Sequence, residues 1–126
     1  MIFDSDVLIW CLRGDLKAGQ IIQSSEARST TLICYLELVQ GARDKRSLAN
    51  IKSFLDQLEF TVHPLTDGVG RRAAELMEEH TLKSGLQLAD ALIAATALEV
   101  GESLCTGNYK HFRGIKELEL KHFLPA

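Results

Sequence analysis

The chain has 126 residues, of which 46% are hydrophobic, and a formal net charge of −3 at pH 7. This length suits one domain over residues 1–126 with a core of its own. No apolar run approaches the ~20 residues of a membrane span, and the amino-terminal residues lack a signal peptide's basic segment. We therefore expect a cytoplasmic protein without a membrane role.

The mild negative net charge argues against a protein that binds nucleic acid through its overall charge. Any such role must be local. Two basic clusters exist, one formed by Arg43, Lys45 and Arg46 and one between Lys110 and His122. Charge patterning alone leaves open whether each cluster is a solvated face or a binding surface.

Three cysteines, Cys11, Cys34 and Cys105, are far apart and lie in apolar contexts. None belongs to a CxxC pair or has a histidine at zinc spacing. We expect them to be buried thiols of a protein from a reducing compartment.

Strand-like and helix-like segments alternate along the chain. The expected strands cover residues 1–4, 30–33, 59–62, 102–106 and 118–120. The expected helices cover residues 7–12, 16–24, 35–42, 45–58, 67–83 and 87–100, and residues 108–112 form a loop or a single helical turn. This alternation predicts an α/β fold with a mostly parallel sheet of four or five strands and right-handed crossovers.

Polar residues follow several of the expected strands. Asp4 ends the first strand, Glu37 follows the second, and Asn108 follows the strand that ends at Thr106. Parallel sheets bind ligands beyond the carboxyl ends of their strands, so these residues should lie at one edge. Asp90 opens the helix that leads into the fourth strand, so its position is less constrained.

Asp90 is the only charged residue between positions 86 and 98, in a helix that is apolar nearly all round. The helix dipole explains an exposed first-turn aspartate, but not one surrounded by apolar neighbours. Asp4 also lies in a buried context, which favours a functional role for both acids.

The remaining candidates have simpler explanations that stay open. Asp6 shares a face with Asp4, but either it or Ser5 could cap the following helix. Glu37 could face solvent, and an asparagine such as Asn108 is common in turns.

Carboxylate and carboxamide oxygens suit Mg²⁺ or Mn²⁺ and not zinc. The chain has no glycine-rich phosphate loop and no Cys–His pair near these acids. The chemistry that remains is attack of a metal-activated water on a phosphodiester.

Four segments carry a resemblance to a known family. They are Asp4-Ser5-Asp6-Val7-Leu8-Ile9, Glu37-Leu38-Val39-Gln40-Gly41, Asp90-Ala91-Leu92-Ile93-Ala94-Ala95-Thr96-Ala97 and Thr106-Gly107-Asn108-Tyr109-Lys110-His111-Phe112. In this order and over this length, the chain resembles a PIN-domain ribonuclease, specifically the VapC-type toxin of type II toxin–antitoxin pairs.

The resemblance implies a three-layer α/β/α domain that cleaves RNA with Mg²⁺ or Mn²⁺. Asp4, Asp90 and Glu37 would be the metal ligands, Asn108 would stand where many members carry a fourth acid, and Thr106 would orient the acids, with Asp6 in support. It further implies a homodimer and a cognate antitoxin that inserts a basic side chain among the acids.

Two departures from the family pattern matter. Asn108 and His111 leave the fourth region without an aspartate, which favours one metal ion over two. Cys34 replaces the Ser or Thr common three residues before the glutamate, which we expect to weaken that helix start by about 1 kcal/mol if a cap is lost.

Three other classes compete with a nuclease. A degenerate PIN domain would only bind its partner. A haloacid-dehalogenase-type phosphatase also begins with a strand and Asp-x-Asp, but it needs a later lysine and an acidic pair. A receiver domain needs an aspartate at the end of a mid-chain strand, whereas Asp56 lies in an expected helix.

Overall fold

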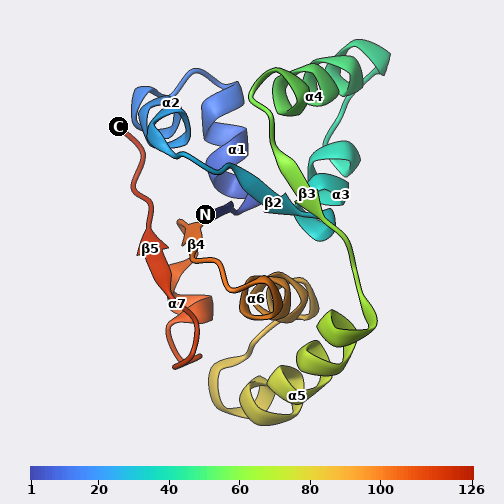
Figure 1. The fold of residues 1–126 in the computed structure, drawn as a ribbon, viewed down its shortest axis with the longest axis vertical. Helices are drawn as coiled ribbons and strands as arrows, with labels where there is room; N and C mark the ends of the chain where they lie inside the picture. Colours follow the sequence, from blue (N-terminus) through green and yellow to red (C-terminus); the bar gives the residue numbers. More distant parts are fainter.

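The computed structural model describes residues 1–126 and has one five-stranded sheet with helices on both faces (Figure 1). The strands are β1 (Ile2–Phe3), β2 (Ser29–Thr31), β3 (Thr61–His63), β4 (Leu104–Thr106) and β5 (Leu120–His122). The helices are α1 (Ser5–Leu12), α2 (Leu16–Ser24), α3 (Leu32–Gln40), α4 (Lys45–Gln57), α5 (Asp67–Ser84), α6 (Leu88–Val100) and α7 (Tyr109–Phe112). All strand pairings are parallel, so the predicted α/β/α architecture is confirmed.

The first strand of the chain lies at the centre of the sheet, whose order is β3-β2-β1-β4-β5. The chain builds outward from β1 to β3 and then crosses to the other side of β1 to form β4 and β5. The strand order therefore reverses between β1 and β4. Open parallel sheets place a crevice at such a point, beyond the carboxyl ends of the strands.

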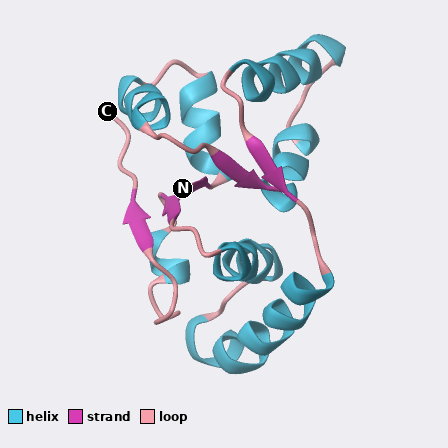
Figure 2. Cartoon of the chain, in the orientation of Figure 1, coloured by secondary structure: helices cyan, strands magenta, loops and turns pink.

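Alternating side chains of the two central strands fill two separate cores. Ile2 and Leu104 pack into the core formed with α5 and α6. Phe3 and Cys105 point to the opposite face, into the core formed with α1, α2 and α4. This alternation follows from the period of two in a strand, and Figure 2 shows helices on both sides of the strands.

The start of α3 corrects two expectations. The strand predicted over residues 30–33 ends at Thr31, and Leu32 and Ile33 already belong to α3. The Thr31 side chain accepts a hydrogen bond from the Cys34 backbone N–H at 3.0 Å and so caps this helix. The predicted loss of a cap at Cys34 was therefore wrong, because the cap lies three residues earlier.

The other boundaries agree more closely with the expectations. Helix α2 matches end to end, and α5 begins at the expected residue, with Thr66 as its N-cap. The last strand lies two residues later than expected, although Leu118 is still buried. None of the helices combines the length and hydropathy that spanning a membrane requires.

Helix α6 is buried along most of its length, as its apolar composition predicts. Residues 93–97 are all buried, whereas Leu88 at its start is 66% exposed. All three cysteines are free thiols; Cys34 and Cys105 are buried and Cys11 is half-buried. The expectation of buried thiols is confirmed for Cys34 and Cys105, but Cys11 is only half-buried.

Candidate functional site

Asp4 lies at the carboxyl end of the central strand and is 3% exposed. It is the N-cap of α1, and its Oδ1 accepts a hydrogen bond from the Ser5 backbone N–H at 2.7 Å. Its Oδ2 accepts a hydrogen bond from Thr106 Oγ1 at 2.7 Å. The first residue of α1 and the last residue of β4 thus each hold one oxygen of the carboxylate, at the point where the strand order reverses.

Glu37 reaches the same position from α3. It is exposed, and its Oε1 accepts a hydrogen bond from Ser5 Oγ at 3.1 Å. Cys34 lies three residues earlier on the same helix face. Ligand atoms of Asp4, Cys34 and Glu37 all lie within 4.8 Å of one another. We call these three residues, together with Ser5, the acid cluster.

No Lys, Arg or His side chain pairs with Asp4, Asp6 or Glu37. Burial raises the pKa of Asp4, and the Glu37 carboxylate raises it further, against hydrogen bonds from Thr106 and Ser5 that lower it. A buried carboxylate beside a second acid, with no cation in the chain, is a group that a bound cation would stabilise.

Cys34 is the third member of the cluster but not a candidate thiolate ligand. Burial, together with the neighbouring Asp4 carboxylate, raises the pKa of this thiol to about 12. The sulfur lies 3.6 Å from Asp4 Oδ1, to which the thiol donates. Of the ligand atoms of Asp4, Cys34 and Glu37, only the carboxylate oxygens are therefore available to a cation at neutral pH.

Asp6 organises the loop beside the cluster. Its Oδ1 accepts from the Val7 N–H at 2.8 Å, and its Oδ2 accepts from the Gly107 N–H at 2.9 Å. Burial, followed by the charge of Asp4, raises the pKa of Asp6 to about 6. A Cβ at Gly107 would lie 2.6 Å from Asp6 Oδ2, so any side chain at this position would force the Asp6 carboxylate or the loop to move.

Asp90 does not belong to the group of converging ligand atoms. Its Oδ2 lies 3.0 Å from His111 Nδ1 and accepts the Gln87 backbone N–H at 3.3 Å, as in a capping box at the start of α6. Both contacts are to Oδ2, and no protein group bonds to Oδ1. The carboxylate keeps one oxygen free for a further ligand.

Asn108 is exposed, and its side chain makes no hydrogen bond. Only its backbone N–H points inward, donating to Thr106 Oγ1 at 3.0 Å. Asn108 thus steadies, through its backbone N–H, the hydroxyl that holds Asp4.

Sequence reasoning missed three contacts at this site, those of Ser5, Cys34 and His111. Helical spacing was a usable signal for Cys34, because it lies one turn before Glu37. No local signal identifies the partner of His111, because the fold alone brings α7 next to the start of α6.

The donor set fits a hard divalent cation. Asp4 and Glu37 present oxygens, and the thiol of Cys34 stays protonated. Asp90, outside this group, has a free oxygen on α6, a helix that packs against α3. Mg²⁺ and Mn²⁺ prefer such ligands, whereas a cysteine site for Zn²⁺ would need a thiolate.

The chain belongs to the PIN domain family, whose model matches residues 1–118. It is 30% identical to Ribonuclease VapC10 of Mycobacterium tuberculosis, in an alignment that covers 100% of this chain and 96% of the relative. It is also 27% identical to Ribonuclease VapC19 of the same species, covering 94% and 96%. The resemblance found in the sequence is confirmed, which argues against the phosphatase and receiver-domain alternatives.

Solved structures of other proteins share this fold. A chain of a toxin–antitoxin complex from Klebsiella pneumoniae is 27% identical, with a TM-score of 0.79 over 93% of both chains. A chain of VapBC-1 from nontypeable Haemophilus influenzae, at 22% identity, shares the fold with a TM-score of 0.79 over 97% of this chain and 98% of its own.

Proposed function

We propose that this chain, as a single PIN domain over residues 1–126, is the toxin of a type II toxin–antitoxin pair. In this proposal it is a cytoplasmic endoribonuclease that hydrolyses RNA phosphodiesters with Mg²⁺ or Mn²⁺. The observation that carries the proposal is the buried Asp4 carboxylate beside Glu37, without any cationic partner, in a chain of the PIN family. The relatives named ribonucleases support the reaction class.

Asp4 and Glu37 would hold the ion, and the free Oδ1 of Asp90 makes this residue the third candidate ligand. When bound, Mg²⁺ or Mn²⁺ supplies an acidified water and stabilises negative charge on the phosphodiester in the transition state. Asn108, the fourth candidate from the sequence, would act through Thr106, to which its backbone N–H donates.

The chain's own groups hold these acids in place. Thr106 and the Ser5 N–H each donate to a different oxygen of Asp4, which restricts rotation of the carboxylate. Ser5 Oγ joins Glu37 to Asp4, with 3.1 Å to Glu37 Oε1 and 3.5 Å to Asp4 Oδ1. Such supporting bonds typically change metal affinity by about 10- to 100-fold.

A cognate antitoxin is the proposed protein partner, and a homodimer the proposed assembly. The related structures are toxin–antitoxin complexes, and the acid cluster offers unpaired carboxylates. An Arg or Lys of the partner would form charge-assisted hydrogen bonds there and block metal binding.

The test is cleavage of total RNA by the purified protein with Mn²⁺, compared with Asp4→Asn and Asp90→Asn. We expect the wild type to cut and both variants to lose at least about 100-fold in rate, since each loses a charged ligand. Asp56→Asn, on the exposed face of α4, is the matched control and should cut normally. Equal behaviour of the wild type and both site variants would falsify the nuclease proposal.

One observation favours a second candidate, a degenerate PIN domain that only binds its partner. Asp90 is paired with His111 and lies outside the converging group of Asp4, Cys34 and Glu37. This alternative predicts no Mn²⁺-dependent cleavage by the wild type, but normal binding of the antitoxin.

A further inference from the structure

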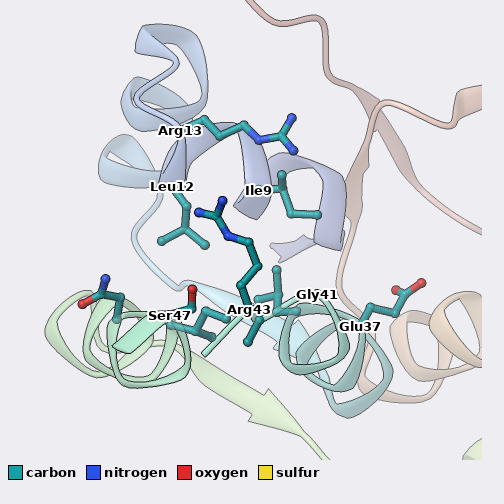
Figure 3. Close-up of a pocket in the computed structure, with 11 residues that line it drawn as sticks. Ile9, Leu12, Arg13, Glu37, Gly41, Arg43 and Ser47 are labelled. Carbon is teal, nitrogen blue, oxygen red and sulfur yellow. The ribbon is translucent and has the colours of Figure 1, made fainter. Parts of the chain in front are cut away.

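A groove lies between α1, α3 and α4, and Glu37 is one of the residues that line it (Figure 3). Its volume is about 550 Å³, within the range of sites that bind small ligands or single side groups of larger ones. Because Glu37 belongs both to the lining of the groove and to the acid cluster, the groove is continuous with the acid cluster.

Two arginines line this groove, and neither guanidinium group is paired. Arg13 ends α1, and Arg43 lies in the connection between α3 and α4. Both are exposed, and neither side chain forms an ion pair or a hydrogen bond within the chain. Figure 3 shows the Arg43 side chain extending towards α1, near Leu12.

The contrast with Arg28 is informative. The Arg28 guanidinium donates to three backbone carbonyls, those of Ile22, Gln23 and Leu58, and is thus used by the fold. Arg13 and Arg43 have no such role, so their donors remain available for an external anion.

The wall between the two arginines is apolar. Ile9 and Leu12 contribute from α1, and Leu38 and Ile51 from α3 and α4. Apolar side chains can contact the nucleobases of a single strand while the two guanidinium groups bind the phosphates between them.

We propose that this groove holds the single strand of RNA next to the cleaved bond, with Arg13 and Arg43 binding its phosphates. This inference rests on the proposed nuclease function and adds the path of the substrate. A chain with a net charge of −3 must attract RNA through local cations, and these two line the same groove as Glu37. An acidic protein segment would also suit the arginines, but it gives no reason for the continuity with the acid cluster.

Binding is measured by fluorescence anisotropy with a fluorescein-labelled, random-sequence single-stranded RNA, in the Asp4→Asn background to prevent cleavage. We expect Arg13→Ala and Arg43→Ala each to weaken binding by about threefold to tenfold. Each should also reduce the slope of log K against log salt by about 0.7, the value for one phosphate contact on a single strand.

Arg46→Ala is the matched control. Arg46 belongs to the same basic segment as Arg43 and is exposed, but it does not line the groove. It should leave the salt slope unchanged. In the otherwise wild-type chain, the Arg13 and Arg43 variants should raise KM and leave kcat nearly unchanged, because these contacts exist before and during cleavage.

The outcomes separate this inference from the proposed function. If the wild type cleaves RNA but both groove variants keep its affinity, KM and salt slope, the groove inference is overturned and the nuclease remains. If the variants instead lose only the binding of a protein partner, the groove is a protein-binding surface and the inference also fails. If RNA binds with the expected dependence on the arginines but is not cut, the nuclease proposal fails alone.

Discussion

Two carboxylates at different ends of the strands, Asp4 and Glu102, have pKa values that are shifted in opposite directions. In the acid cluster, Asp4 lies at the carboxyl end of β1 without a cation, and burial raises its pKa. Glu102, just before β4, lies 2.8 Å from the Met1 amino group and 2.6 Å from His63 Nε2, and it accepts a hydrogen bond from Ser29 Oγ at 3.2 Å. Burial raises the pKa of Glu102, but these hydrogen bonds and the amino-group charge outweigh it, so the pKa is lowered.

This difference distinguishes a carboxylate that stabilises the fold from one that is available to bind an external cation. Glu102 has its positive partner within the chain, so its charge contributes to folding. Asp4 is held by neutral donors alone, so its charge costs folding free energy until a cation binds from outside. Asp4, whose charge is not neutralised within the folded chain, is therefore a better candidate for a functional residue than Glu102, whose charge is.

The largest expected effect is the response of stability to metal. At 100 times its dissociation constant, Mn²⁺ should stabilise the wild type by about 2.7 kcal/mol, whereas Asp4→Asn should show no shift. The metal-free variant should be at least as stable as the metal-free wild type, because a buried charge is gone. Thermal unfolding with and without Mn²⁺ measures both, and a full shift in the variant would remove Asp4 from the metal site.

Next in size is the contribution of the hydroxyl that holds Asp4. Thr106→Val should weaken Mn²⁺ binding by about 10- to 100-fold in a calorimetric titration, because Asp4 Oδ2 loses its donor. Thr30→Val is the matched control, since the buried Thr30 hydroxyl donates to the Phe3 carbonyl at 2.8 Å and not to an acid. Equal losses in both variants would mean that a general loss of packing, and not the contact with Asp4, is responsible.

The close approach of Gly107 to Asp6 gives a third test at the same end of the sheet. Gly107→Ala should cost about 1–3 kcal/mol of stability, because its Cβ would lie 2.6 Å from Asp6 Oδ2. Gly114→Ala, where the Cβ meets nothing within 4 Å, should cost much less. In a double-mutant cycle measured by urea unfolding, Asp6→Ala should relieve part of the cost, and strict additivity would show that the two residues do not interact.

The smallest expected effect concerns Glu102 at the other end of the strands. Glu102→Gln should cost about 1 kcal/mol near neutral pH, where the partly exposed carboxylate is charged. The folded-state pKa is lowered from 4.5, so this stability is present above pH 4.5 and is lost as the pH falls through the folded value. Unfolding curves of wild type and variant should converge in acid, while the exposed Glu78→Gln should match wild type throughout.

Local patterns were enough to predict most elements and the location of the acids at strand ends. The misplacement of Leu32 and Ile33 has a clear cause, since a short apolar, β-branched run suits either state and the Thr31 cap decided it. Asp4, Glu37 and Asn108 were predicted to lie at one edge of the sheet, and ligand atoms of Asp4 and Glu37 lie within 4.8 Å of each other there. The pairing of Asp90 with His111 was not predictable, because it depends on how α7 packs against α6.

The central position of β1 also affects synthesis of the chain. Its partner β4 and the donor Thr106 are encoded near the other end, and the Thr106–Asp4 hydrogen bond joins residues 102 positions apart. Contacts between such distant residues form late and slowly. On the ribosome, Asp4 emerges early but stays without its Thr106 donor until translation is nearly finished, so an incomplete nascent chain contains every residue of the acid cluster but cannot hold Asp4 Oδ2 in place.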